Sequence, residues 1–205
     1  MKTPVPKNEA KRIKVLWEYD VLDTVPEEVF DELAELAGLI CGAPISLISL
    51  VDENRQWFKS KIGVTISETD RDVSMCAHAI MGDDLFIIAD ASKDARFKNN
   101  PLVTGGPKIR FYAGAPLVTP DGHALGTLCV IDKVPRHLAD NQKQALRVLA
   151  RHVMTQLELR RHARELATAR DDCKIVKQNL AKALSEITRL KLKLKPIKSS
   201  RRSKV

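Results

Sequence analysis

The sequence predicts an α+β fold: a mostly antiparallel β-sheet flanked by helices, followed by a long C-terminal helix. Apolar, branched residues from Ile45 to Asp52 predict a buried strand, and residues 55–62 predict its hairpin partner after a short polar turn. A second pair of strands, at 111–118 and 124–132, flanks Thr119-Pro120-Asp121-Gly122, a strong turn signal. Hairpins joined through covering segments and bracketed by helices are typical of an α+β domain.

Two helices are expected before the sheet. Residues 9–19 have helical spacing of apolar side chains. Thr24, followed by Pro26 and two glutamates, predicts the capped start of a second helix, which continues to Ile40 on one apolar face. Gly42-Ala43-Pro44 then ends that helix.

The segment between the two hairpins is expected to cover one face of the sheet. Polar residues 65–73 predict a loop, and residues 74–81 predict a short helix. Residues 86–89 predict a brief strand ending at Asp90, and residues 94–106, rich in Asn, Asp, Gly and Pro, predict a loop with a helical turn.

The last helix begins at Asp140 and is expected to end at Pro196. Apolar or small residues fill both core positions of about four heptads, which predicts a parallel coiled coil and therefore a homodimer. The predicted interface positions are Leu166, Ala169, Cys173, Val176, Leu180, Ala183, Ile187, Leu190 and Leu194. The upstream apolar positions keep a different register, so the phase slips near residues 157–161. The alternative is one long helix that folds back on its own domain.

Composition and charge divide the chain into four parts. These are a helical arm (1–19), a folded α+β domain (20–159), the predicted coiled coil (160–195) and a basic disordered tail (196–205). The chain carries +8, and 15 basic against 4 acidic residues from Arg160 onward account for +11, which leaves −3 for residues 1–159. The basic end predicts non-specific, salt-dependent contact with nucleic acid or an anionic surface. A solvated terminus without a partner is the alternative.

The expected compartment is the cytoplasm. No window approaches the roughly 18 apolar residues of a membrane span, and the N-terminus lacks a signal-peptide pattern. Four scattered cysteines without a Cys-x-x-Cys pair indicate reduced thiols. Cys173 faces its dimer mate in the coiled-coil register, where it is either a filler thiol or the site of an interchain disulfide.

Ordered motifs between Ser46 and Asp132 show a family resemblance. They are Arg55-Gln56-Trp57-Phe58, Cys76-Ala77-His78-Ala79-Ile80, Asp94-Ala95-Arg96-Phe97, Ile109-Arg110-Phe111-Tyr112-Ala113-Gly114-Ala115-Pro116-Leu117 and Gly126-Thr127-Leu128-Cys129-Val130-Ile131-Asp132. In this order they resemble the GAF family of small-molecule and redox sensor domains, over about residues 20–159. The resemblance implies a ligand pocket between the sheet and its covering segments.

The resemblance names eight candidate ligand-binding residues on the covered side of the sheet. They are Phe58, Cys76, His78, Asp90, Phe97, Arg110, Tyr112 and Cys129. An arginine at 110 suits a carboxylate or phosphate; alternatively, an Arg–Asp pair fixes the loop at 94–106 onto the sheet. Cys76-x-His78 suits a reactive thiol near a helix start, or a thiol packed inward beside a hydrogen-bonded imidazole.

Several cofactor chemistries lack their motifs. Cys76 and His78 supply two ligands where zinc takes four, so no metal site is predicted. The intervening alanine departs from the bilin-binding members of the family, and the cyclic-nucleotide motif of Asn, Lys, Phe, Asp and Glu is not found. No cofactor or specific ligand is therefore assigned.

The predicted function is a dimeric regulatory domain that binds a small molecule or senses redox state and transmits the signal through the coiled coil. Two alternatives remain. One is a thiol enzyme resembling the free methionine sulfoxide reductases, whose cysteine pattern this sequence does not match convincingly. The other is a dimeric scaffold that senses nothing.

Overall fold

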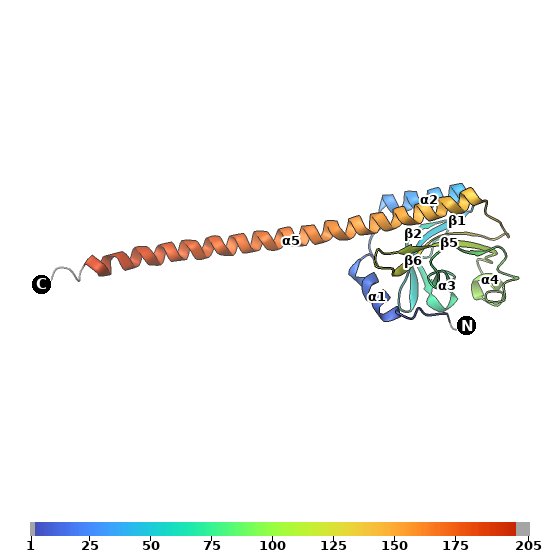
Figure 1. The fold of residues 1–205 in the computed structure, drawn as a ribbon, viewed down its shortest axis with the longest axis horizontal. Coiled ribbons are helices and arrows are strands. Elements are labelled where there is room, and N and C mark those ends of the chain that lie inside the picture. The colour runs from blue at the N-terminus through green and yellow to red at the C-terminus, as the bar shows by residue number, and fades with distance from the viewer. Residues whose placement is uncertain (1–2, 200–205) are drawn as a thin grey trace. The chain divides into compact units, whose positions relative to one another are not determined.

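The computed structural model describes residues 3–199, with side chains as far as Lys193. The chain divides into two compact units with the boundary after Leu159. The helices and strands, labelled in Figure 1, are α1 (Glu9–Glu18), α2 (Glu28–Cys41), β1 (Ile45–Val51), β2 (Arg55–Ile62), β3 (Glu68–Asp70), a 3₁₀ turn (Arg71–Val73), α3 (Cys76–Ala79), β4 (Phe86–Ile88), α4 (Pro101–Thr104), β5 (Phe111–Val118), β6 (Ala124–Asp132) and α5 (Asp140–Ser199).

One six-stranded sheet organises the first unit. Its strand order is β3-β2-β1-β6-β5-β4, and every neighbouring pair is antiparallel. The two predicted hairpins, β1–β2 and β5–β6, are joined at the centre through β1 and β6. The predicted α+β fold is confirmed.

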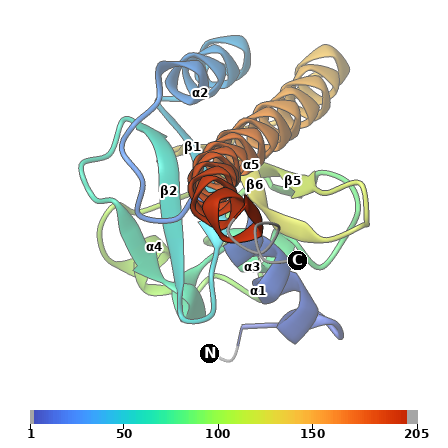
Figure 2. The same cartoon turned by 90° about the vertical axis from the view of Figure 1, so that its left-hand side faces the viewer.

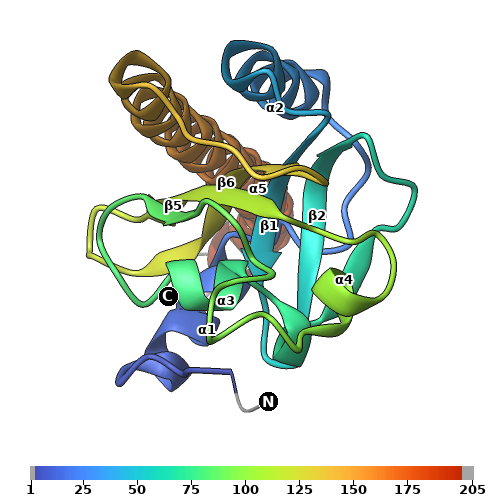
Figure 3. The ribbon, with the colours of Figure 1, turned by 90° about the vertical axis from the view of Figure 1, so that its right-hand side faces the viewer.

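The sheet buries both faces. On one face, α2 and the first turns of α5 pack over the larger apolar cluster, which includes Trp57. On the other face, α3 and the segments around α4 cover a smaller cluster, which includes Phe58 (Figures 2 and 3). Trp57 and Phe58 therefore lie on opposite faces, as the period-two alternation of a strand requires.

The prediction that Thr24 caps the second helix is wrong. Gly42 ends α2 in the left-handed conformation, as predicted, but the helix begins at Glu28 and has no side-chain cap. The Thr24 hydroxyl instead donates to the Val21 carbonyl (2.7 Å) and accepts from the ammonium of buried Lys59 (3.0 Å). The Thr24 hydroxyl, which the local sequence predicted as the helix cap, thus forms its hydrogen bonds with Val21 and with the distant Lys59.

The sequence predicted a loop over residues 65–73, but only part of this segment is loop. Glu68–Asp70 forms β3, paired to the start of β2, and a 3₁₀ turn follows. The other covering segments are confirmed with tighter bounds: α3 lies within residues 74–81, β4 within 86–89 and α4 within 94–106.

Helix α5 contributes to the core only through its first turns. Leu146, Leu149, Val153 and Leu157 are buried in the larger cluster of the first unit. The helix continues past the predicted end at Pro196 to Ser199. Of the predicted basic disordered tail, residues 200–205 lie outside the described part of the chain, as does the side chain of Leu194.

Candidate functional site

Three of the eight candidate residues meet at the centre of the covered face. Cys76 begins α3, Cys129 lies in the middle of β6, and Tyr112 lies on β5, each 2% exposed or less. The two sulfurs are 3.9 Å apart, and the Tyr112 hydroxyl donates to Cys76 Sγ at 3.3 Å. The hydroxyl also lies 3.4 Å from Thr127 Oγ1. The site therefore groups the two thiols with the hydroxyls of Tyr112 and Thr127.

A glycine makes room for this group. A Cβ on Gly114 would lie 2.3 Å from the Tyr112 hydroxyl oxygen, because Tyr112 and Gly114 share one face of β5 and the Tyr112 hydroxyl reaches back over Gly114. Gly114 is also the register partner of Cys129 on β6. The missing side chain lets the Tyr112 hydroxyl reach the thiols.

The thiols differ in proton affinity. Burial alone would raise the pKa of Cys76, but hydrogen bonds from Cys129, Thr127, Tyr112 and Ser49 together lower it to about 6. The hydrogen bond with Cys76, followed by burial, raises the pKa of Cys129 well above its ordinary value. The pair therefore favours a thiolate at Cys76 and a protonated thiol at Cys129.

His78 and Phe97 form an aromatic cover beside the thiols. Their ring centroids are 4.7 Å apart, edge to face, and Phe86 lies 6.2 Å from Phe97. The Arg96 guanidinium lies over both phenyl rings, 4.8 Å from Phe86 and 5.3 Å from Phe97. The carboxylate of Asp94 holds Arg96 with two hydrogen bonds, of 2.9 and 2.6 Å.

The histidine is a structural partner within this cover. His78 Nδ1 lies 3.2 Å from the Ser74 carbonyl, which accepts only, so Nδ1 carries the proton. Burial lowers the pKa of His78. Among the described residues, no three side chains of His, Cys, Asp or Glu come together as a metal site.

Phe58, Asp90 and Arg110 are placed differently from the central group. Phe58 belongs to the covered apolar cluster, on β2. Asp90 accepts from the Ser92 backbone and hydroxyl within its own turn. Arg110 donates to the carbonyls of Val103 (2.9 Å) and Ile109 (3.0 Å). Arg110 therefore fixes the loop at 94–106, through backbone carbonyls and not through the Arg–Asp pair considered from the sequence.

A buried polar chain that the sequence did not reveal anchors the start of α3. Ser74 donates to Gln56 Oε1 (2.5 Å), and Gln56 donates to Thr69 on β3 (2.6 Å). Ser74 Oγ also accepts from the Ala77 amide at 3.0 Å. Serine and glutamine give no sequence signal for such a chain, because it depends on the pairing of β2 with β3.

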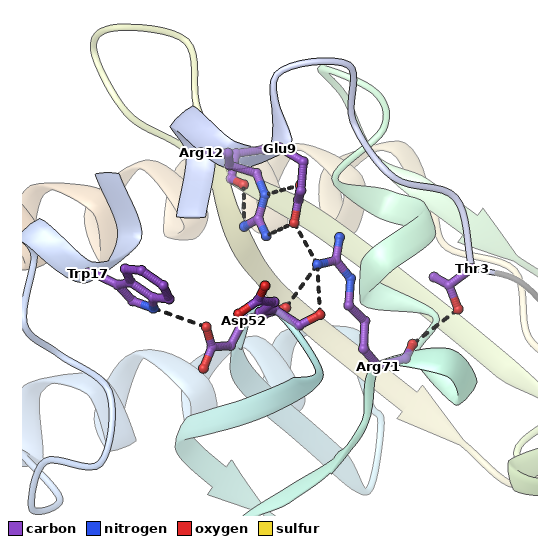
Figure 4. Close-up of polar contacts among 8 residues, drawn as sticks. Thr3, Glu9, Arg12, Trp17, Asp52 and Arg71 are labelled. Carbon is purple, nitrogen blue, oxygen red and sulfur yellow. Dashed lines mark hydrogen bonds and ion pairs between the residues drawn. The ribbon is translucent and has the colours of Figure 1, made fainter. Parts of the chain in front are cut away.

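A second network joins the N-terminal arm to the domain (Figure 4). Glu9 on α1 pairs with Arg12 (2.7 Å) and with Arg71 (2.5 Å), and both arginines are more than nine-tenths buried. Arg71 also donates to the carbonyl of Asp52, whose carboxylate accepts from Trp17 at 3.2 Å. The arm is therefore fastened at the β1–β2 turn.

The surface hollows lie away from the thiols. The largest by volume of four hollows, about 610 Å³, is lined by residues 63–66 with Gly106 and Pro107. Another, of about 580 Å³, lies between the start of α2 and β2 and includes Phe58 and Lys59. None of these four hollows is lined by Cys76, His78, Tyr112 or Cys129. The candidate site is filled by its own side chains.

The fold and this covered face define a class of domain. A model of the GAF domain matches residues 25–157, which is more than half of the chain, so the chain belongs to the GAF domain family of signalling and sensor domains. No helix within the described residues is long and apolar enough to cross a membrane.

Among curated proteins, the chain is 45% identical over 155 residues to the cyclic di-GMP phosphodiesterase PA2567 of Pseudomonas aeruginosa. The match covers 75% of this chain and 26% of that protein, so the chain spans about a quarter of that relative's length.

Solved structures share the fold. The GAF domain of a phosphoenolpyruvate-protein phosphotransferase from Coxiella burnetii superposes with a TM-score of 0.57 at 16% identity, over 78% of this chain and 97% of that one. A free methionine-R-sulfoxide reductase from Neisseria meningitidis superposes with a TM-score of 0.54 at 15% identity, over 80% and 98%. At these identities the likeness shows the fold alone.

Proposed function

We propose that this chain is the regulatory GAF module of a cyclic di-GMP signalling system, and that it senses a signal at its covered face and passes it on as a dimer. The single observation that carries the proposal is the 45% identity to a cyclic di-GMP phosphodiesterase of which the chain spans about a quarter. A segment of that size is suited to setting the activity of a larger enzyme, in the same chain or in a partner.

Helix α5 supports transmission. Its first turns are part of the domain core, and its later turns carry an exposed apolar seam at the predicted heptad positions. On this seam the apolar side chains are between 48% (Ile187) and 72% (Leu166) exposed. An uncovered seam of this length favours a second copy of the same helix as its partner.

The dimer is tested by one substitution with a matched control. Leu180→Asp places a charge on the seam, whereas Ile175→Asp places the same charge off the seam at nearly equal exposure (58% against 56%). Light scattering after size-exclusion chromatography should show that Leu180→Asp weakens the dimer about 100-fold, because a buried unpaired charge costs on the order of 3 kcal/mol. The control should remain dimeric. A wild-type monomer at all concentrations would refute the dimeric mode.

The filled interior favours a second candidate, a scaffold that dimerises without sensing. Native mass spectrometry and an absorption spectrum of gently purified protein separate the two. Retained extra mass, or a helix packing that changes with oxidation, supports a sensor. A dimer that carries no extra mass and whose helix packing does not change on oxidation supports the scaffold. Turnover of free methionine sulfoxide would instead support the thiol enzyme.

The basic end of α5 stays a separate prediction. Lys191 and Lys193 are exposed, and they belong to the basic C-terminal part of the chain. Any binding to nucleic acid or an anionic surface should weaken steeply as salt rises.

A further inference from the structure

The covered face places two cysteines from distant parts of the sequence in contact. Cys76 and Cys129 are separated by 53 residues along the chain, yet their sulfurs are 3.9 Å apart inside one apolar cluster. Cys129 is held in β6 between β1 and β5, opposite Leu47 and Gly114. Cys76 begins a helix of only four residues. One thiol is thus fixed in the sheet and the other lies on a small covering element.

Cys76 and Cys129 are buried, at 2% and 0% exposed, so peroxide should reach Cys76 only when the short helix α3 opens; the hydrogen bonds around the pair nevertheless suit a reactive thiol. The Tyr112 hydroxyl donates to Cys76 at 3.3 Å, and Gly114 leaves the space that this hydroxyl needs. These hydrogen bonds favour the Cys76 thiolate, which is the nucleophilic form. Cys129 keeps its proton and lies in position to resolve an oxidised partner.

The other two cysteines, Cys41 and Cys173, lie outside the cluster that holds this pair. Cys41 lies in the cluster on the opposite face of the sheet, and burial raises the pKa of its thiol to about 11. Cys173 is exposed on α5, in the second unit. The chain therefore contains its own comparison thiols, one buried and one exposed.

We propose that Cys76 and Cys129 form a reversible dithiol–disulfide pair that hydrogen peroxide oxidises, and that this pair is the redox form of the proposed sensing role. The Cys76 thiolate attacks a peroxide oxygen; an S–O bond forms, the O–O bond breaks, and hydroxide leaves and takes up a proton as water. Cys129 then attacks the sulfenic sulfur of Cys76; the S–S bond forms, and the oxygen leaves as water with the Cys129 proton. Two thiols are oxidised and one peroxide is reduced to two waters.

Closure of the bond would move the cover. A disulfide needs sulfurs about 2 Å apart, so the 3.9 Å contact must shorten by nearly half. Because β6 is held on both sides, α3 should make most of the movement, and it should carry His78 against the Phe97 and Phe86 rings. The Tyr112 hydroxyl would lose its thiolate acceptor.

The test is non-reducing tryptic mapping of the wild-type chain after treatment with hydrogen peroxide. Cys76 and Cys129 fall on separate tryptic peptides, residues 72–93 and 111–133, whereas Cys41 falls on residues 15–55 and Cys173 on residues 171–174. We expect the first two peptides to appear as one cross-linked mass, two hydrogens lighter than their sum, and to separate after dithiothreitol. Oxidation that reaches only Cys173, or leaves the two peptides unlinked at full consumption of peroxide, overturns the proposal.

Variants then assign the roles. Cys129→Ser should leave a sulfenic acid at Cys76 that dimedone traps, and Cys76→Ser should abolish both the trap and the cross-link. Tyr112→Phe keeps both thiols and removes the hydroxyl, so oxidation should slow by about tenfold. Cross-linking by free methionine sulfoxide but not by peroxide would replace the switch with a catalytic role and overturn it.

The mapping of the wild-type chain requires no variant, so a failure of Cys76→Ser to fold does not affect it. The result is also independent of the oligomeric state. A cross-link in a monomeric protein would support the disulfide and refute the dimer. A dimer without a cross-link would support the dimer and refute the disulfide.

Discussion

At the scale of single residues, close backbone contact between β1 and β6 decides which substitutions are possible at Gly126. Gly126 lies opposite Leu50 on β1, and a Cβ at this position would approach the Ser49 carbonyl oxygen to 1.9 Å. A clash with backbone in the centre of a sheet has no flexible side chain to relieve it. We therefore expect Gly126→Ala to lower the free energy of unfolding by about 3 kcal/mol, measured by urea denaturation.

Gly82 provides the matched control. A Cβ there meets nothing within 4 Å, so Gly82→Ala should change the free energy of unfolding by less than about 0.5 kcal/mol. Equal effects at the two glycines would show that β1 and β6 do not approach this closely.

At the same scale, the sequence predicted some site residues and missed others for one physical reason. Cys76, Tyr112 and Cys129 could be predicted as candidate site residues, because strand alternation and the family resemblance together assign them to one face. Phe86, Arg96 and Gln56 were not, because their roles depend on rings and loops that meet only after folding. Residue type alone does not show that Arg110 would bind backbone carbonyls instead of a carboxylate.

At the scale of elements, the hairpins were predictable and their polar edges were not. Apolar alternation and the Pro-Asp-Gly turn define β1, β2, β5 and β6 locally. Strand β3 consists of Glu68, Thr69 and Asp70, which have no apolar period, and it exists because β2 supplies its hydrogen bonds. Thr24 was wrongly predicted as a helix cap for the same reason, because its hydroxyl bonds to the distant Lys59.

The attachment of α1 is an element-scale prediction. Burial raises the pKa of Glu9, but hydrogen bonds and charge from Arg12 and Arg71 outweigh burial and hold this pKa below the ordinary 4.5. The charged carboxylate therefore stabilises the folded arm above about pH 4.5. That contribution is lost as pH falls from 4.5 through the lower folded-state pKa, because the unfolded chain takes up the proton first.

We expect Glu9→Gln to lower the free energy of unfolding by about 2–3 kcal/mol at pH 7, since it leaves two buried guanidinium groups without their carboxylate. The difference from wild type should shrink below pH 4.5. Glu18→Gln, on the same helix but with only a 4.0 Å exposed ion pair to Lys14, is the control and should change little. A difference that stays constant down to pH 3 would contradict the role given to Glu9.

At the scale of the whole molecule, the two units differ in charge and in burial. The first 159 residues carry −3 and contain both apolar clusters, whereas the remainder carries +11 and its described side chains are almost all exposed. The proposed sensing and the proposed transmission would thus belong to parts of the chain with different physical demands. This division predicts that the first unit folds without the second.

A chain truncated after Leu159 should therefore unfold cooperatively, with a free energy of unfolding within about 1 kcal/mol of that of the Leu180→Asp variant at a concentration where this variant is a monomer. The reason is that every residue of the two clusters lies at or before Leu157. The Leu180→Asp variant is the appropriate reference, because the proposed dimer would make the stability of the wild-type chain depend on concentration.

Truncation after Arg151 is the informative control. It removes Val153, Met154 and Leu157, which are between 0% and 7% exposed in the larger cluster. Loss of three such side chains costs on the order of 6 kcal/mol or more, which is comparable to the whole stability of a domain of this size. Circular dichroism and urea denaturation should therefore show a folded 1–159 fragment and an unfolded 1–151 fragment. If both fragments unfold, residues beyond Leu159 contribute to the stability of the first unit, and the proposed division of the chain into two independent parts is wrong.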